Sequence, residues 1–161
     1  MGTIRDLLLD HRVLDLGPLP APRLPPRVSL KQALPFLARA RRGAIVVVDG
    51  TSPVGILTER DVVRRVAPRI GKELETLART TVSEVMSSPP GMIERRAPLA
   101  DAVRTMADRR FRHLVVIGRE GELRGMLTAA DLVQYMTDQF PEETLNLPPI
   151  LHQKFTRPEG G

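Results

Sequence analysis

The chain carries the same short motif twice, and this repetition constrains its fold more than any other feature. The first copy is Gly-Ile-Leu-Thr-Glu-Arg-Asp at residues 55–61, and the second is Gly-Met-Leu-Thr-Ala-Ala-Asp at residues 125–131. The shared pattern is a glycine, two apolar residues, a threonine, any two residues and an aspartate. A repeated unit of this size is one supersecondary structure that needs a neighbour to bury its apolar face, so we expect two similar units that pack together.

The similarity extends upstream of the motif. Three further pairs of segments align: 28–34 with 97–103 and 44–48 with 113–117, both at an offset of 69, and 3–8 with 81–86. Each unit is therefore a complete supersecondary element.

Apolar spacing predicts the elements of each unit. Apolar residues three and four positions apart indicate helices at 30–38 and 99–107. Short β-branched runs at 44–48 and 114–117 are typical of buried strands. A turn leads to a second strand that ends at the motif, and a helix follows. Met92-Ile93 marks a first strand in the second copy, whereas nothing clear marks one in the first, so the predicted order is strand, helix, strand, strand, helix.

Two segments are expected to lie outside the repeats. Residues 17–27 hold five prolines and predict a stiff, extended connection, and the chain beyond residue 140 has too little periodic apolar content for a domain. The predicted organisation is a first repeat at 1–80, with the proline-rich insert at 17–27 and a linker helix at 70–79, a second repeat at 81–140, and a C-terminal tail at 141–161.

On these residues, the two units resemble CBS domains, and the pair resembles a Bateman module over residues 3–139. The family often has proline at Val46 and Val115 and aspartate at Gly118, but these departures spare the threonine and aspartate of the motif. The resemblance implies an α/β (α+β) fold of two β-α-β-β-α repeats with pseudo-two-fold symmetry. Since each unit has only about three strands, the sheets are expected to pack face to face.

The pairs Thr58–Asp61 and Thr128–Asp131 allow two interpretations. A threonine after a strand, with a carboxylate three residues later, is typical of a helix N-cap with a capping box. A cap needs no glycine three residues upstream, whereas close approach of a ligand to the backbone favours one, and both copies have it. One carboxylate can accept hydrogen bonds from both hydroxyls of a ribose, and the helix N-terminus favours an anion.

The resemblance implies that these positions bind adenosine compounds such as AMP, ADP, ATP or S-adenosylmethionine, with the base between aliphatic side chains and the first-strand backbone. The matching apolar candidates are Ile45, Met92, Ile93 and Leu114. The cationic candidates for the phosphate groups are Arg60, Arg112 and His113. A surface position is the alternative for Arg60, and a structural role is the alternative for His113.

The net charge of +5 is carried mainly by arginine. The arginine clusters indicate either a polyanion surface or, since acidic residues are interspersed, solvated helix faces, and we favour the latter. They comprise Arg39, Arg41 and Arg42; Arg64, Arg65 and Arg69; Arg95 and Arg96; and Arg109, Arg110 and Arg112. Aromatic residues make up only 3% of the chain, which disfavours the stacking that single-stranded nucleic-acid binders use.

Several classes of function find no support. The sequence has no cysteine, no Walker loop and no hydrolase or zinc-protease motif, and its three histidines are too scattered for a metal site. No apolar run approaches the roughly 18 residues of a membrane helix, and the first residues do not resemble a secretory signal. We therefore expect neither an enzyme nor a membrane protein.

The leading hypothesis is a stand-alone cytoplasmic sensor with no obligatory cofactor. It would bind an adenine nucleotide as a regulatory ligand, form a homodimer and act on an unidentified effector protein. The alternatives are a partner-binding scaffold with vestigial sites and, less expected, a basic nucleic-acid-binding protein.

Overall fold

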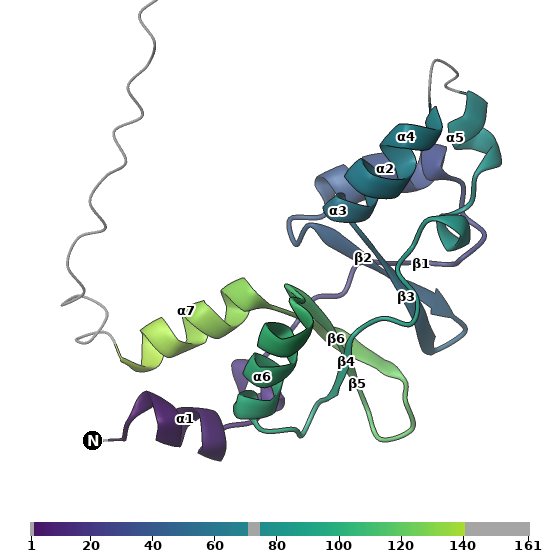
Figure 1. Ribbon diagram of the computed structural model, residues 1–161. Helices are drawn as coiled ribbons and strands as arrows, with labels where there is room; N and C mark the ends of the chain where they lie inside the picture. Colours follow the sequence, from purple (N-terminus) through teal and green to yellow (C-terminus); the bar gives the residue numbers. More distant parts are fainter. Residues whose placement is uncertain (1, 71–74, 141–161) are drawn as a thin grey trace, which may run out of the picture.

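The structure, a computed structural model, describes residues 2–70 and 75–140, and this part of the chain forms two similar units (Figure 1). Each described unit contains a three-stranded sheet, in the order β1-β2-β3 or β4-β5-β6. The strands are β1 (Arg23–Leu24), β2 (Ala44–Asp49), β3 (Ser52–Thr58), β4 (Met92–Glu94), β5 (His113–Ile117) and β6 (Leu123–Thr128). The first pair in each sheet is parallel and the second is antiparallel, which confirms the predicted mixed α+β fold.

The described helices follow the predicted order. They are α1 (Ile4–Asp10), α2 (Leu30–Arg39), α3 (Glu59–Asp61), α4 (Ala67–Ile70), α5 (Glu75–Arg79), α6 (Leu99–Arg109) and α7 (Ala129–Gln139). A π-helical turn at Val62–Val66 joins α3 to α4, so these three segments correspond to α7 of the second repeat. Of the predicted linker helix at 70–79, Glu75–Arg79 is helical, and residues 71–74 lie outside the described residues.

The sequence predicts that the proline-rich segment 17–27 lies outside the repeats. This prediction is wrong, because the segment contains β1, which pairs with β2 of the first sheet. Arg23 lies opposite Val46 in the parallel pairing of β1 with β2, as Met92 lies opposite Val115 in the pairing of β4 with β5. Both residues of the first pair are related to those of the second by the repeat offset of 69. β1 is an edge strand, and edge strands tolerate nearby prolines because one side of the strand needs no donor.

The two sheets pack face to face, as predicted. A shared core between them is formed by Ala44, Val46, Val48, Ile56, Val115 and Met126. Along β2, the alternate residues Ile45 and Val47 point the other way, into the core of the first unit. This period of two gives each sheet one face for its own helices and one face for the other repeat.

The segment that precedes each repeat packs on the other repeat. Val13 is fully buried in the core of the second unit, and Val82 and Val85 are fully buried in the core of the first. α1 accordingly lies beside α6 rather than beside α2 (Figure 1). The predicted boundary between residues 80 and 81 therefore follows chain order, whereas the packed units exchange their first segments.

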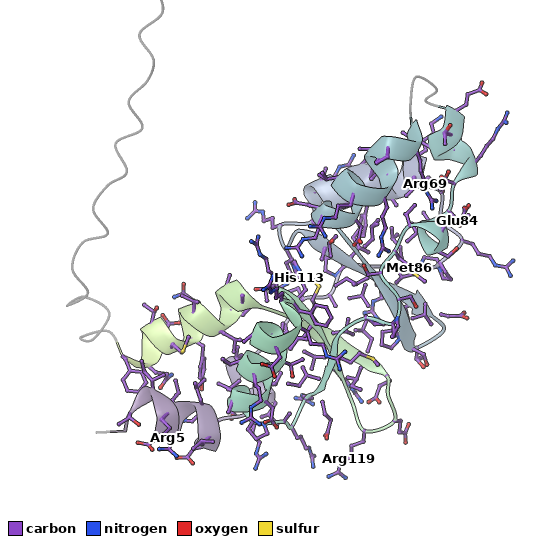
Figure 2. All side chains as sticks on the ribbon, viewed as in Figure 1. Arg5, Arg69, Glu84, Met86, His113 and Arg119 are labelled. Carbon is purple, nitrogen blue, oxygen red and sulfur yellow. The ribbon has the colours of Figure 1, made fainter. Side chains whose placement is uncertain are left out.

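The two exchanged segments begin with the same local structure. Asp6 accepts hydrogen bonds from the amide (2.8 Å) and hydroxyl (2.9 Å) of Thr3, and Glu84 accepts them from the amide (2.6 Å) and hydroxyl (2.9 Å) of Thr81. Both hydrogen bonds favour the ionised carboxylate, so they lower the pKa of Asp6 and of Glu84. The bond from the backbone amide has the larger effect, and the bond from the hydroxyl has the smaller. The Arg69 guanidinium also donates to the Glu84 carbonyl (3.4 Å), and the two residues are seen close together in Figure 2.

The exchanged segments also explain the glycine of each motif. A Cβ at Gly125 would lie 2.5 Å from the carbonyl oxygen of Leu19, and a Cβ at Gly55 would overlap the sulfur of Met86. These glycines therefore leave room for Leu19 and Met86 of the chain itself and not, as the sequence predicts, for a ligand.

These contacts predict unequal costs for the two Gly→Ala substitutions. Gly125→Ala is expected to lower the free energy of unfolding by about 3 kcal/mol, because the backbone of Leu19 must shift, and Gly55→Ala by only about 1 kcal/mol, because the flexible Met86 side chain can move. Denaturant titration of both variants measures this difference. Equal losses of stability in the two variants, or no loss for Gly125→Ala, would contradict the close contact of Gly125 with the Leu19 backbone.

Candidate functional site

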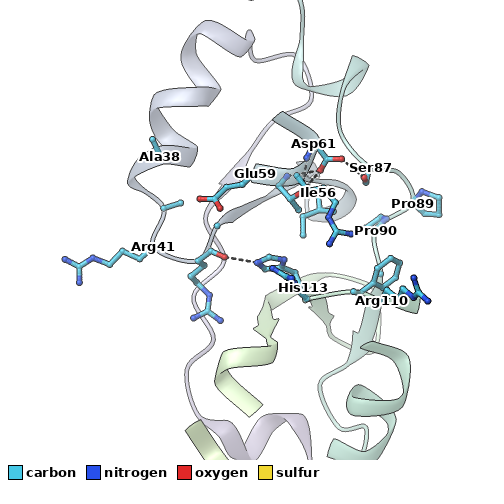
Figure 3. A pocket seen from close by; sticks show the side chains of 18 residues that line it. Ala38, Arg41, Ile56, Glu59, Asp61, Ser87, Pro89, Pro90, Arg110 and His113 are labelled. Atoms are coloured by element: carbon cyan, nitrogen blue, oxygen red, sulfur yellow. Dashed lines mark hydrogen bonds between the residues drawn. The ribbon is translucent and has the colours of Figure 1, made fainter. Parts of the chain in front are cut away.

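A cleft of about 600 Å³ lies where the first motif faces the second unit (Figure 3). Its lining is drawn from four segments, at residues 38–43, 56–61, 87–91 and 110–113. Two of these come from the first repeat and two from the second, of which 87–91 lies near its start and 110–113 joins α6 to β5. The cleft thus has walls from both halves of the chain, and the exchanged segment supplies the wall at 87–91.

Asp61 is held in the cleft by a capping box and by a residue of the second repeat. Its Oδ2 accepts hydrogen bonds from the amide (2.9 Å) and hydroxyl (2.7 Å) of Thr58, whose Oγ1 accepts one from the Asp61 amide (3.2 Å). Its Oδ1 accepts a hydrogen bond from the Ser87 hydroxyl (2.9 Å), drawn as a dashed line in Figure 3. The Nε of Arg65 lies 3.8 Å from the same oxygen, within ion-pair range but beyond hydrogen-bond distance. The capping interpretation is therefore correct for the local structure, and Oδ1 has room for one more donor because a carboxylate oxygen accepts two hydrogen bonds.

The second motif has the same capping box but a different neighbour. Asp131 Oδ2 accepts a hydrogen bond from the Thr128 amide (2.7 Å), and Thr128 Oγ1 accepts one from the Asp131 amide (3.2 Å). The Arg42 guanidinium also pairs with this carboxylate, at 2.5 Å to Oδ2 and 3.3 Å to Oδ1. The prediction that the arginine clusters are solvated is thus wrong for Arg42.

Cationic groups predominate along the cleft at the first motif. The predicted residues Arg60, Arg112 and His113 line it, together with Arg110. Within the described part of the chain, the guanidinium groups of these three arginines form no ion pair with a carboxylate. His113 lies at the junction of the two units (Figure 2), and its Nε2 is 2.8 Å from the Arg42 carbonyl, to which it donates when it carries the proton. The excess of unpaired positive charge favours an anion.

The structure corrects the predicted apolar wall of the site. Ile45, Ile93 and Leu114 are buried in the cores of their own units and do not line the cleft, because their positions in the strands point them away from the opposite sheet. Met92 is 44% exposed and follows Gly91, which lines the cleft. The apolar lining comes instead from residues that include Ile56, Pro90 and Phe111.

Sequence reasoning missed Ser87, Arg110 and Phe111 as cleft residues and Arg42 as the partner of Asp131. Applying the offset of 69 aligns Arg42 with Phe111, so a difference between the two copies was visible there. Ser87 belongs to an exchanged segment, and no local pattern indicated its position. Among the residues that the structure describes, no group of three or more His, Asp and Glu side chains could hold a metal ion. Nor does any described helix have the length and hydropathy to cross a bilayer.

Comparisons with known proteins match both units of the chain. A family model described as the CBS domain matches residues 18–68 and 82–138. The first match includes β1, in agreement with its pairing in the structure. The protein MK0525 of Methanopyrus kandleri is 32% identical over 105 residues, which are 63% of this chain and 52% of that protein. The chain thus spans about half the length of this curated relative.

Solved structures resemble this one over most of its length. The CBS-domain-containing protein ATU1752 from Agrobacterium tumefaciens has a TM-score of 0.63 and 30% identity, covering 77% of this chain and 94% of that one. The CBS domain protein PAE2072 from Pyrobaculum aerophilum, complexed with AMP, has a TM-score of 0.66 and 26% identity, covering 79% of this chain and 99% of that one.

Proposed function

The chain belongs to the CBS-domain family, and we propose that it is a cytoplasmic regulatory module that binds an adenine nucleotide in the cleft at Asp61. The observation that carries this proposal is the cleft itself, which brings a buried carboxylate together with three arginines that form no ion pair within the described residues. The AMP complex of PAE2072 supports adenine nucleotides as the ligand class. The module has no catalytic activity in this proposal.

The polar groups of the cleft suit a ribose. Asp61 Oδ1 accepts a hydrogen bond from one ribose hydroxyl, in addition to the one from Ser87. The Ser87 hydroxyl, whose proton points to Asp61, accepts a hydrogen bond from the second ribose hydroxyl. The proposed arrangement thus differs from the expectation from the sequence, in which one carboxylate accepts hydrogen bonds from both ribose hydroxyls.

The remaining lining suits the two ends of the nucleotide. The phosphate lies towards Arg60, Arg112 and His113, where charge-assisted hydrogen bonds are strongest. The base packs against the apolar lining at Ile56 and Phe111, and Met92 remains a candidate contact at the edge. A nucleotide with more phosphates gains most from Arg60, the only cation within the motif itself.

A panel of AMP, ADP, ATP and S-adenosylmethionine in a thermal unfolding assay tests the ligand class. A ligand present at about 100 times its dissociation constant is expected to add about 2.7 kcal/mol to the free energy of unfolding. If no member raises the melting temperature of the folded protein, the scaffold hypothesis replaces this proposal. Salt-dependent binding of an oligonucleotide would instead favour the nucleic-acid alternative.

We also propose a homodimer that signals to a separate effector protein. Val63 and Val133 occupy equivalent positions in the helices after the two motifs, and they are 70% and 58% exposed. A closed pair is the commonest oligomeric symmetry and would cover both residues. Light scattering at micromolar concentration is expected to give twice the mass of the chain, and Val63→Glu with Val133→Glu is expected to give a monomer. A wild-type monomer would contradict the dimer.

A further inference from the structure

The second motif is occupied by an arginine of the first repeat. Arg42 lies in the loop before β2, and its guanidinium donates to both oxygens of Asp131 and to the Met126 carbonyl (2.6 Å). The side chains of Arg42 and Asp131 are only 18% and 23% exposed. The contact therefore joins the two repeats at the position that corresponds to the ribose site of the first cleft.

A guanidinium group imitates what a ribose offers to a carboxylate. Two parallel N–H groups donate to the two oxygens of the carboxylate, in the way that two neighbouring hydroxyls would. Asp131 then accepts three hydrogen bonds, the same number as Asp61, so the two sites differ in the donor: at Asp131 a guanidinium group faces both carboxylate oxygens, where a ribose would have to approach. Arg42 and a nucleotide thus compete for the same carboxylate.

The first motif has no such bidentate partner among the described residues. The residue that aligns with Arg42 at the offset of the repeats is Phe111, whose side chain carries no donor. Asp61 accepts instead the single hydroxyl of Ser87, while the equivalent residue beside the second motif is Leu19. This equivalence follows from the backbone, since the Ser87 and Leu19 carbonyls each accept a hydrogen bond from the amide two positions before the motif threonine, in β3 and β6 respectively.

The hydrogen bonding of Arg42 beside Asp131 is incomplete. Its Nε is buried and has no hydrogen-bond partner among the described residues. Buried donors in folded proteins are nearly always paired. The unpaired Nε lowers the net stabilisation that Arg42 gains beside Asp131, so this contact costs less to open than a fully satisfied one.

We infer that Arg42 is an internal ligand of the second motif and closes the Asp131 site to nucleotide, so that each chain binds one nucleotide, at Asp61. This inference rests on the proposed function of the Asp61 cleft. It makes the two motifs unequal: one is an open site, and the other is a latent site that is closed by the chain itself.

Calorimetric titration with AMP measures the number of sites per chain. The wild type is expected to bind one AMP, and Arg42→Ala is expected to bind two. The double variant Arg42→Ala/Asp131→Asn is expected to return to one. The matched control is Arg39→Ala, which removes an exposed arginine outside the cleft, and it is expected to bind one. If Arg42→Ala fails to fold, Arg42→Met keeps the aliphatic stem and tests the same point.

The outcomes separate this inference from the proposed function. One site in both the wild type and Arg42→Ala would overturn the inference alone, and so would two sites in the wild type. No site in the wild type and one in Arg42→Ala would overturn the function proposed for Asp61, and with it the count of one site per chain, while it would support the closure of the Asp131 site by Arg42. No binding to either protein would overturn both. The variant Arg42→Ala/Asp61→Asn is expected to keep one site, and loss of both sites would contradict a latent site at Asp131.

Discussion

Replacing Asp61 with alanine is expected to weaken AMP binding at least 100-fold. The carboxylate accepts one charge-assisted hydrogen bond from the ribose, which contributes roughly 1.5–3 kcal/mol, and it also orients the Ser87 hydroxyl that accepts from the second ribose hydroxyl, so the loss of both contacts accounts for a change of this size. The removal of the helix cap is expected to lower the free energy of unfolding by about 1 kcal/mol as well. Calorimetry and thermal unfolding of the same variant measure both quantities.

A capping box outside the cleft provides the control. Asp6 accepts the same two hydrogen bonds from Thr3 that Asp61 accepts from Thr58, but it lies on α1 and is not part of the cleft lining. Asp6→Ala is therefore expected to lower stability without changing the affinity for AMP. If Asp61→Ala behaves in the same way as Asp6→Ala, then Asp61 is only a helix cap.

Replacing Val13 with aspartate is expected to lower the free energy of unfolding by about 4 kcal/mol or more, because an unpaired charge in an apolar core has no compensating partner. Val13 is fully buried in the core of the second unit. Although Val13 precedes the first repeat, the damage is expected in the second. Hydrogen exchange should therefore show the greatest loss of protection in β4, β5 and β6.

An exposed residue of the same segment provides the comparison. Leu9 lies on α1, and more than half of its surface is exposed. Leu9→Asp is therefore expected to leave the free energy of unfolding nearly unchanged, since substitutions at exposed positions rarely alter stability. If Val13→Asp instead lowers the hydrogen-exchange protection of the first sheet and leaves that of the second unchanged, the segments are not exchanged.

Most of the architecture could be predicted because short-range sequence patterns indicate most of its helices and strands. The three- and four-residue spacing indicated α2 and α6, and the β-branched runs indicated β2 and β5. β1 lacks such a pattern, since Arg23 and Leu24 lie among prolines, but the offset of 69 from Met92 would have located it. Alignment of the two repeats thus locates β1, which the local composition does not.

The exchange of the first segments could not be predicted in this way. The apolar residues of the exchanged segments predict burial, but their spacing is the same whichever core they enter. Only the path of the chain between the units decides that Val13 fills the second core and Val82 the first. The cleft depends on this path, because Ser87 reaches Asp61 along it.

The candidate site was predicted in part for related reasons. Thr58 and Asp61 follow from a local motif, and Arg60 is part of that motif. Alternation along β2 indicates that neighbouring residues face opposite sides, but not which side meets the other sheet. Arg42 and Asp131 are 89 residues apart in the chain, and Arg42 is one of two adjacent arginines, so no local pattern indicates which of the two pairs with Asp131.

A crystal structure of the protein with AMP tests the central claim most directly. We predict that AMP occupies the cleft between the repeats, with a ribose hydroxyl within hydrogen-bond distance of Asp61 Oδ1 and the phosphate beside Arg60 or Arg112, while Arg42 stays on Asp131. AMP bound away from this cleft, or bound beside Asp131 with the Asp61 cleft empty, would contradict the account.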